Sequence, residues 1–250
     1  DQWVRSRPFP DAWLGYLSEG LSVYSDLSPQ EQIRLRQLIL VFLARKKFYG
    51  CAGLAITDQM RVIIAAQACL LLLNQGWAVY PKLSSVLVYP SAFQVEREEL
   101  QADGVVSTGA HHLLGESWGN GRVILSWDDV ESGVTDFTDG HNVVLHEFAH
   151  KLDEETGVMN GLPLLQSREH YEAWSSVLSK EYESFLGRVK TGKNKVIDEY
   201  GAVSPVEFFA VLSESFFEKP KLMREKLPDL YAQLHRVYDV DPASWGSAKD

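Results

Sequence analysis

Apolar residues recur at helical spacing in the first third of the chain. Beyond Ser28-Pro29-Gln30-Glu31 they recur with a period near 3.6 residues, as Ile33, Leu35, Leu38, Ile39 and Phe42. The Ser-Pro-Gln-Glu segment is a capping box with proline at the first helical position, so it predicts the start of a helix. Thr57 is expected to cap a second helix that runs to Leu73 and is ended by Gly76. Residues 1–75 therefore indicate a helical N-terminal portion.

The pattern changes after Trp77. Residues 86–89 are a continuous apolar run stopped by Pro90, and residues 122–127 form a second, mostly apolar run. Gly119-Asn120-Gly121, a strong turn signal, precedes the second run, so both runs are predicted to be strands. The last hundred residues again have helical patterning. We therefore expect an α+β protein, with residues 1–250 forming one compact unit that has a helical portion (1–75) and a second portion (76–250).

Composition excludes several classes of function. The formal net charge of −10 repels phosphate backbones, so nucleic acid is not expected as a partner. The longest apolar run, from Val62 to Leu73, is interrupted by Gln67 and is too short to cross a bilayer, so no membrane association is expected. Cys51 and Cys69 fit neither a zinc knuckle nor a disulfide scaffold, and such low cysteine usage favours a reducing compartment.

Residues 146–150 carry the chemistry, and they read His146-Glu147-Phe148-Ala149-His150. A helix places positions i and i+4 on one face, so both imidazoles can bind a single Zn²⁺ at about 2.0–2.1 Å. Glu147 then lies beside them, where it can accept a proton from a water on the metal. Apolar neighbours supply a buried helix face, and Gly157 is expected to end the helix. The segment therefore predicts a catalytic zinc site with a general base.

Such a site needs a third protein ligand and an open position. The pattern with glycine three residues after the second histidine, and a ligand three residues further on, fails here, because those positions hold Asp153 and Thr156. Asp153 lies one turn beyond His150 and is expected to hydrogen-bond a ligand histidine.

Glu207, which opens a second apolar helix, is the preferred third ligand. Ser204-Pro205-Val206-Glu207 is also a capping box, so spacing alone leaves open whether Glu207 only caps that helix. Asp198 and Glu214 are rival ligands. Glu214 lies two turns after Glu207 on the same face and could instead hydrogen-bond a ligand.

A purely structural zinc site is one alternative. It would need a fourth protein ligand and would have no use for Glu147. His111-His112 could supply that ligand, although a loop dipeptide of this kind is more often at the surface. A binding protein in which the zinc site is secondary is the other alternative.

Two segments carry a family resemblance. His-Glu-Phe-Ala-His-Lys-Leu-Asp at 146–153, followed by Glu-Phe-Phe-Ala-Val-Leu-Ser-Glu at 207–214, resembles the Mlc titration factor A family of glucose-regulated zinc metallopeptidases. A more distant likeness is to the catalytic domain of anthrax lethal factor, in which a Tyr also lies seven residues before a Glu that opens a Glu-Phe-Phe-Ala segment. Here these are Tyr200 and Glu207. The lethal factor helix has a further Glu where this chain has Val211, so that role is lost or has moved to Glu214.

The resemblance implies His146, His150 and Glu207 as zinc ligands, Glu147 as general base and Tyr200 as an active-site hydroxyl. It implies a cytoplasmic peptidase of aminopeptidase type that acts on peptides and binds the repressor Mlc. The expected fold is zincin-like, with the active-site helix under a small mixed sheet and additional N-terminal helices. The strand at 123–127, which a polar loop should connect to that helix, is the expected edge on which an extended peptide adds.

Overall fold

The computed structural model describes residues 2–76, 78–91, 99–100, 106–107, 121–194 and 196–246. Short 3-10 turns occur at Ser22–Asp26, Glu199–Ala202 and Pro242–Ser244. The helices are α1 (Gln2–Arg5), α2 (Asp11–Gly20), α3 (Pro29–Arg45), α4 (Asp58–Leu70), α5 (Trp127–Thr135), α6 (Val143–Glu154), α7 (Arg168–Lys190), α8 (Pro205–Glu218), α9 (Pro220–Lys226) and α10 (Pro228–Tyr238). The strands are β1 (Lys47–Gly50), β2 (Ser85–Tyr89), β3 (Glu99–Leu100), β4 (Val106–Ser107) and β5 (Arg122–Ser126).

The first two long helices begin where the sequence predicts. Ser28 and Glu31 form the complete capping box of α3, and the Thr57 side chain accepts a hydrogen bond from the Met60 backbone at the start of α4. Helix α4 ends at Leu70, three residues before the predicted end at Leu73. Every residue from Val62 to Leu70 is buried, because α4 packs against both α2 and α3.

Strands β1, β2 and β5 form a parallel sheet in that order. The α+β class is confirmed, but the expectation of a mixed sheet is wrong for these strands. Parallel neighbours need a crossover connection, and α4 lies in the crossover between β1 and β2. Strand β1 has only four residues and no clear alternation, so its sequence gives no strand signal. The short strands β3 and β4 pair with each other in antiparallel fashion.

Strand β5 is one residue shorter than predicted. It ends at Ser126, whose side chain accepts a hydrogen bond from the Asp129 backbone and caps α5. The nine-residue helix α5 thus lies between β5 and α6, where the sequence suggested a polar loop. Among the described strands, β5 pairs only with β2, so it lies at an edge of the sheet. Gly119, Asn120, His111 and His112 lie outside the described residues.

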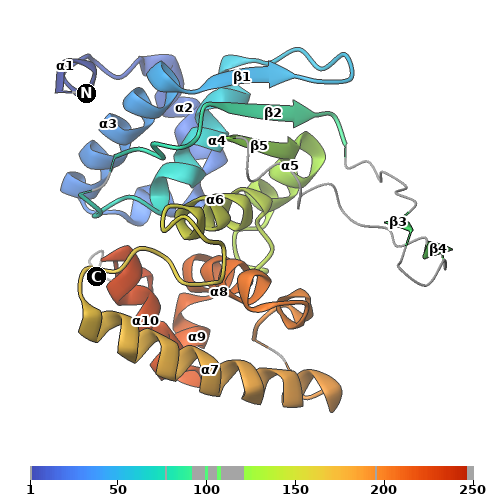
Figure 1. The fold of residues 1–250 in the computed structure, drawn as a ribbon. Coiled ribbons are helices and arrows are strands. Elements are labelled where there is room, and N and C mark those ends of the chain that lie inside the picture. Colours follow the sequence, from blue (N-terminus) through green and yellow to red (C-terminus); the bar gives the residue numbers. More distant parts are fainter. Residues whose placement is uncertain are drawn as a thin grey trace.

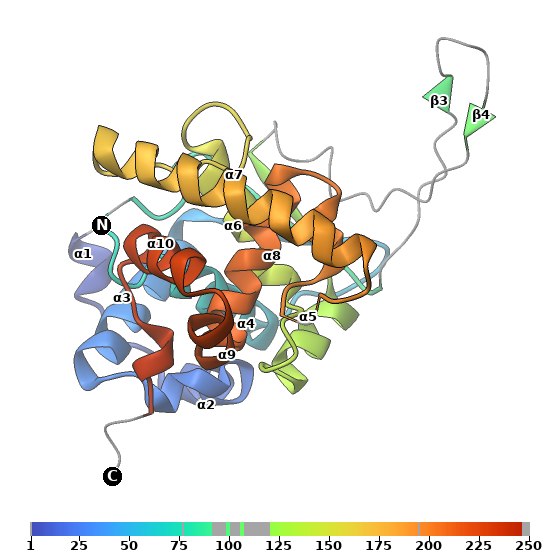
Figure 2. The same ribbon diagram turned by 90° about the horizontal axis from the view of Figure 1, so that it is seen from below.

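Helix α6, which carries residues 146–150, occupies the middle of the molecule. In Figure 1 the sheet, α6, α8 and α7 follow one another from top to bottom, with α2, α3 and α4 beside the sheet. Figure 2, seen from below, shows α7 on the side of α8 that faces away from the sheet. The Phe148 ring of α6 packs against Phe42 of α3 and Tyr80, at centroid distances of 5.7 and 4.9 Å. The N-terminal helices therefore share one hydrophobic core with the helix that carries residues 146–150.

None of the helices in the described ranges is both long and apolar enough to cross a lipid bilayer.

Candidate metal centre

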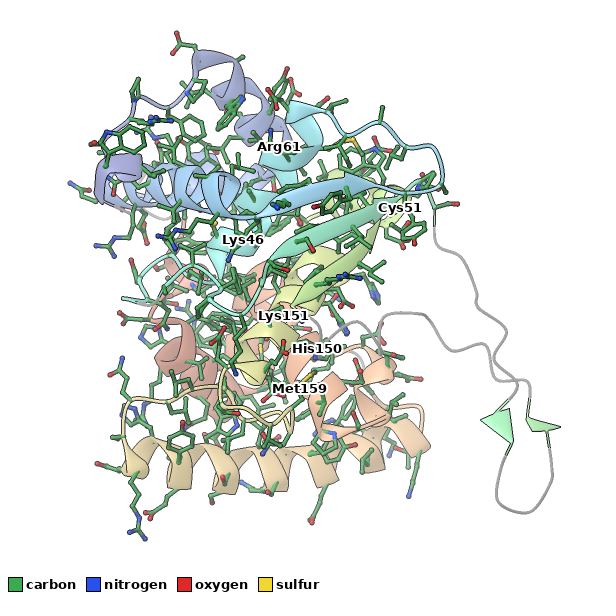
Figure 3. All side chains as sticks on the ribbon, turned by 45° about the horizontal axis from the view of Figure 1, so that its top comes forward. Lys46, Cys51, Arg61, His150, Lys151 and Met159 are labelled. Carbon is green, nitrogen blue, oxygen red and sulfur yellow. The ribbon has the colours of Figure 1, made fainter. Side chains whose placement is uncertain are left out.

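Helix α6 presents the motif of residues 146–150 from a firmly capped start. The Asn142 side-chain oxygen accepts hydrogen bonds from the backbone of Val144 at 3.1 Å and Leu145 at 3.0 Å. All residues from Val144 to Asp153 are buried, and the helix ends at Glu154, shortly before Gly157 with φ +92°. Figure 3 labels His150 on α6, between the sheet and the C-terminal helices. The prediction of a buried helix over the motif is confirmed.

Three predicted ligand side chains converge at this place. The Nε2 atoms of His146 and His150 lie 3.1 Å apart, and Glu207 Oε2 lies 3.0 Å from the first and 3.4 Å from the second. His150 is fully buried, and His146 and Glu207 are 9% and 8% exposed. Among the described residues, these are the side chains grouped closely enough to hold a metal ion, with all ligand atoms within 4.8 Å of one another.

The hydrogen bond between His146 and Glu214 decides which ring nitrogen of His146 carries a proton when the ring is neutral. His146 Nδ1 lies 2.8 Å from Glu214 Oε1, and a carboxylate only accepts, so Nδ1 donates the hydrogen bond. In its neutral form His146 has one N–H, so Nε2 then presents a lone pair toward Glu207 Oε2, which is itself an acceptor. These facing lone pairs repel one another unless a proton or a metal cation lies between them.

The distances suit a tetrahedral divalent metal. Donor atoms at 2.0–2.1 Å from such an ion lie about 3.3–3.4 Å from one another. The observed separations of 3.0, 3.1 and 3.4 Å are close to these edges. Two imidazoles and one carboxylate are also the donor types that divalent zinc accepts, so the residues present fit the metal.

The electrostatics of the protein groups alone also favour a positive charge here. Burial opposes charge on His146, but hydrogen bonds to Glu207 and Glu214 outweigh it and hold the pKa of His146 well above its ordinary value. Burial also opposes charge on Glu207, yet the two histidines lower its pKa to about 2. Burial lowers the pKa of His150 to about 4 and favours the neutral imidazole that a metal needs.

Glu207 does not complete the capping box that its sequence offers. The Ser204 Oγ atom accepts a hydrogen bond from the Glu207 backbone at 3.2 Å and so caps α8. The Glu207 carboxylate faces the two histidines instead. The rival ligand Asp198 lies outside the three-residue cluster. Its Oδ1 atom accepts from the Tyr200 backbone at 2.6 Å, and its Oδ2 atom lies 2.9 Å from His141 Nδ1.

Tyr200 lies beside the metal centre, on the short turn before α8. Its ring centroid is 6.0 Å from that of His146, and its side chain is 44% exposed. Burial, with the charges of Glu207 and Glu147, raises the pKa of Tyr200, so the phenol keeps its proton. A cavity of about 300 Å³ opens here, and its walls include Tyr200, Val211 and His146.

Asp153 has a different role from the predicted one. Instead of bonding a histidine, its carboxylate accepts from the backbone of Gly161 at 2.7 Å and Leu162 at 3.0 Å. It thereby holds the chain that leaves α6. The prediction was wrong because the chain folds back onto Asp153 eight residues later, which helix geometry alone does not indicate.

Glu214 hydrogen-bonds His146, which was the alternative to its being a metal ligand itself. Its other oxygen accepts from the Asn142 backbone, and Glu218, one turn later on α8, accepts from the Asn142 side chain at 3.0 Å. Burial raises the pKa of Glu218 to about 8. Asn142 and Glu218 are not among the residues predicted from the sequence. Signals for both were present, because Asn142 directly precedes an apolar helical run and Glu218 follows Glu214 by four residues.

Two histidines one turn apart on a buried helix, an adjacent glutamate and a carboxylate from a second helix define the class of metal-dependent peptidases. The family model described as glucose-regulated metallo-peptidase M90 matches residues 1–239, and the chain belongs to that family.

Similar proteins occur in several bacteria. An uncharacterised protein of Synechocystis sp. (slr2042) is 43% identical over 238 residues, which are 94% of this chain and 86% of that protein. Mlc titration factor A of Pectobacterium atrosepticum is 33% identical, over 96% of this chain and 91% of its own length. Mlc titration factor A of Klebsiella pneumoniae is 35% identical, over 89% and 84%. The resemblance to the Mlc titration factor A family is thus confirmed, and the family implies a divalent metal and peptide substrates.

Proposed function

We propose that the chain is a zinc-dependent metallopeptidase in which His146, His150 and Glu207 hold the metal. The convergence of three buried donor atoms carries this proposal. Zinc bound there would polarise the scissile carbonyl and bring the pKa of a bound water near 7. Within the described residues, the cluster has three protein ligands rather than four, which favours a catalytic over a structural site.

Glu147 is the proposed general base. It directly follows His146 and is 1% exposed, and its charge acts on both His146 and Tyr200. A carboxylate at this position can accept a proton from the attacking water and pass it to the leaving amine. The surrounding burial excludes bulk water and strengthens each of these interactions.

Tyr200 is the proposed donor to the oxyanion. Its phenol keeps its proton, and it stands beside His146 at the wall of the 300 Å³ cavity. A neutral hydroxyl there can donate a hydrogen bond to the oxygen on which negative charge develops. Glu214 would act through His146, because its hydrogen bond fixes both the ring orientation and the tautomer.

Peptide is the proposed substrate, bound as an added strand along β5. This strand contacts α6 directly and forms an edge of the described sheet, so its free backbone groups can pair with an extended chain. By resemblance, cleavage is of aminopeptidase type and takes place in the cytoplasm. Acetylating the N-terminus of a cleaved peptide tests this type, because an aminopeptidase stops acting on the blocked peptide whereas an endopeptidase continues.

Binding of the repressor Mlc is the second proposed function. The printed name of two relatives, Mlc titration factor A, supports it. In the alternative account, sequestering this regulator is the main role and the zinc site is secondary. Titrating Mlc with the Glu147→Gln variant tests that account, because a purely sequestering protein needs no general base.

The decisive test of the peptidase is Glu147→Gln, with metal content and cleavage measured on one preparation. We expect full zinc content and a fall in kcat of about 10²-fold or more, because general base catalysis contributes about 10²–10⁴-fold. Normal cleavage by a variant that retains its zinc would exclude Glu147 as the base. No cleavage by wild type with full zinc, over a broad peptide set, would favour the sequestering account.

A further inference from the structure

A second cavity, of about 830 Å³, lies on the face of the sheet opposite the buried residues Val86 and Val88. The first residues of the strands, Lys47, Ser85 and Arg122, lie side by side in its wall. Neighbouring strands are about 4.8 Å apart, so the backbones of Lys47 and Arg122 are separated by about 10 Å.

The charged residues in the cavity wall are all basic. They are Arg45, Lys46, Lys47 and Arg122, and neither aspartate nor glutamate lines the cavity. The whole chain has the opposite balance, with 34 acidic and 24 basic residues. A wall of one sign on a protein of the other sign focuses positive potential and attracts anions to this place.

Lys46 contributes a buried cation. Its side chain is among the buried charged residues, at 6% exposure, and Nζ donates to the backbone oxygens of Tyr80 at 2.6 Å and Leu83 at 2.7 Å. Burial, with the charge of Arg45, lowers the pKa of Lys46 to about 8, and Glu155 acts in the opposite direction. Figure 3 shows Lys46 near the starting ends of β1 and β2.

Three of the four cations at this cavity, Lys46, Lys47 and Arg122, form no ion pair with a carboxylate of the described residues. Lys47 and Arg122 are exposed, so their head groups are accessible to a ligand. An anion bound between them would gain charge-assisted hydrogen bonds without displacing an existing partner.

The wall beside these cations is already in place. The Tyr80 hydroxyl donates to the Ala68 backbone oxygen at 2.6 Å, and its ring packs on Phe148. Lys82 Nζ donates to the backbone oxygen of Glu154 at 2.7 Å. These bonds fix the segment 78–84 between α4 and α6, so the cavity is preformed and a ligand need not order a loop.

We propose that this cavity binds a small organic molecule that carries a phosphate group. Its volume lies within the range of about 300–1,000 Å³ that is typical of small-ligand sites. Lysine and arginine, with the hydroxyl of Ser85, supply donors for phosphate oxygens, while Val79, Leu83 and Leu87 supply an apolar wall for the rest of the molecule. The site is separate from the metal centre and does not depend on the proposed peptidase activity.

Calorimetric titration of the full chain with phenyl phosphate tests this proposal. We expect saturable binding to wild type, and at least about tenfold weaker binding to Lys47→Gln and Arg122→Gln, because each removes a hydrogen bond from a charged donor. Lys190→Gln, which removes an exposed charge on α7, is the matched control and should bind as wild type does. Glu207→Ala should also bind normally, which separates this cavity from the metal centre.

Further ligands identify the chemistry. Benzoate has the same ring and a carboxylate, and we expect it to bind more weakly than phenyl phosphate. Absent binding of phenyl phosphate, equal affinity in the Arg122→Gln variant, or loss of binding in Glu207→Ala would each overturn the proposal. Binding of hexaglutamate in place of phenyl phosphate would also overturn it, in favour of an acidic protein segment.

Discussion

Helices α3 and α8 begin with the same sequence pattern, Ser-Pro-x-Glu, at Ser28 and Ser204. In both, the serine Oγ atom accepts a hydrogen bond from the backbone of the glutamate three residues later. The Glu31 carboxylate turns back to the Ser28 backbone N–H at 2.9 Å and completes the capping box. The Glu207 carboxylate instead lies 3.0 Å from His146 Nε2 and 3.4 Å from His150 Nε2.

The difference comes from what surrounds each carboxylate. Near Ser28 the capping bonds are exposed, and the Glu31 carboxylate accepts hydrogen bonds from the backbone N–H and the hydroxyl of Ser28. Glu207 is 8% exposed, and α6 brings two imidazoles to it, which lower its pKa although burial opposes this. The local pattern specifies where a helix begins, whereas contacts between distant segments decide what its glutamate does.

The largest expected effect follows Glu207→Ala. Removing the carboxylate leaves two protein ligands, so we expect zinc to be lost on dialysis and peptidase activity to fall to background, with the helical content retained. Metal analysis and circular dichroism of the purified variant test this. If Glu207 only caps α8, the variant keeps its zinc and loses only stability, by about 0.3–1.5 kcal/mol.

Tyr200→Phe should affect the reaction without affecting the metal. It removes only the hydroxyl, and losing one oxyanion donor lowers kcat by about 10²-fold. Zinc content and melting temperature should match those of wild type. A near-normal kcat would exclude the phenol as the donor, and a loss of zinc would identify it as a ligand.

Glu214→Gln tests whether the carboxylate that hydrogen-bonds His146 Nδ1 supports metal binding. Loss of such a partner weakens metal affinity or activity by about 10–100-fold. We therefore expect weaker zinc binding in a competition titration with a chelator. Arg168→Gln, at an exposed pair on α7, is the control and should change neither value. Unchanged affinity in Glu214→Gln would mean that His146 needs no such partner.

Glu31→Ala, the counterpart of Glu207→Ala, should have the smallest effect. It removes half of an exposed capping box, so we expect the free energy of unfolding to fall by about 0.3–1.5 kcal/mol. Zinc content and kcat should not change. Denaturant unfolding alongside metal analysis measures both, and a loss of zinc would show that the two glutamates are not functionally distinct.

Those features that depend on local sequence could be predicted. The capping residues Ser28 and Thr57 fix the starts of α3 and α4, and the spacing of His146 and His150 places both on one helical face. Glu207 and His146 are 61 residues apart in the sequence, so spacing could not decide whether Glu207 is a metal ligand or only a helix cap. The family resemblance then favoured the ligand.

Other features arise from folding of distant segments and left little local signal. Asp153 is bonded by a chain reversal at Gly161, strand β1 has four residues that pair only because β2 lies beside them, and α5 occupies a segment expected to be a loop. The basic cavity likewise exists only because parallel pairing brings Lys47, Ser85 and Arg122 into one row.

The most direct test of the metal centre is a zinc anomalous difference map from crystals of the zinc-loaded protein. The account predicts one strong peak at about 2.0–2.2 Å from His146 Nε2, His150 Nε2 and a carboxylate oxygen of Glu207. A peak elsewhere would contradict it, and so would a Glu207 side chain turned back to the Ser204 backbone as Glu31 is to Ser28.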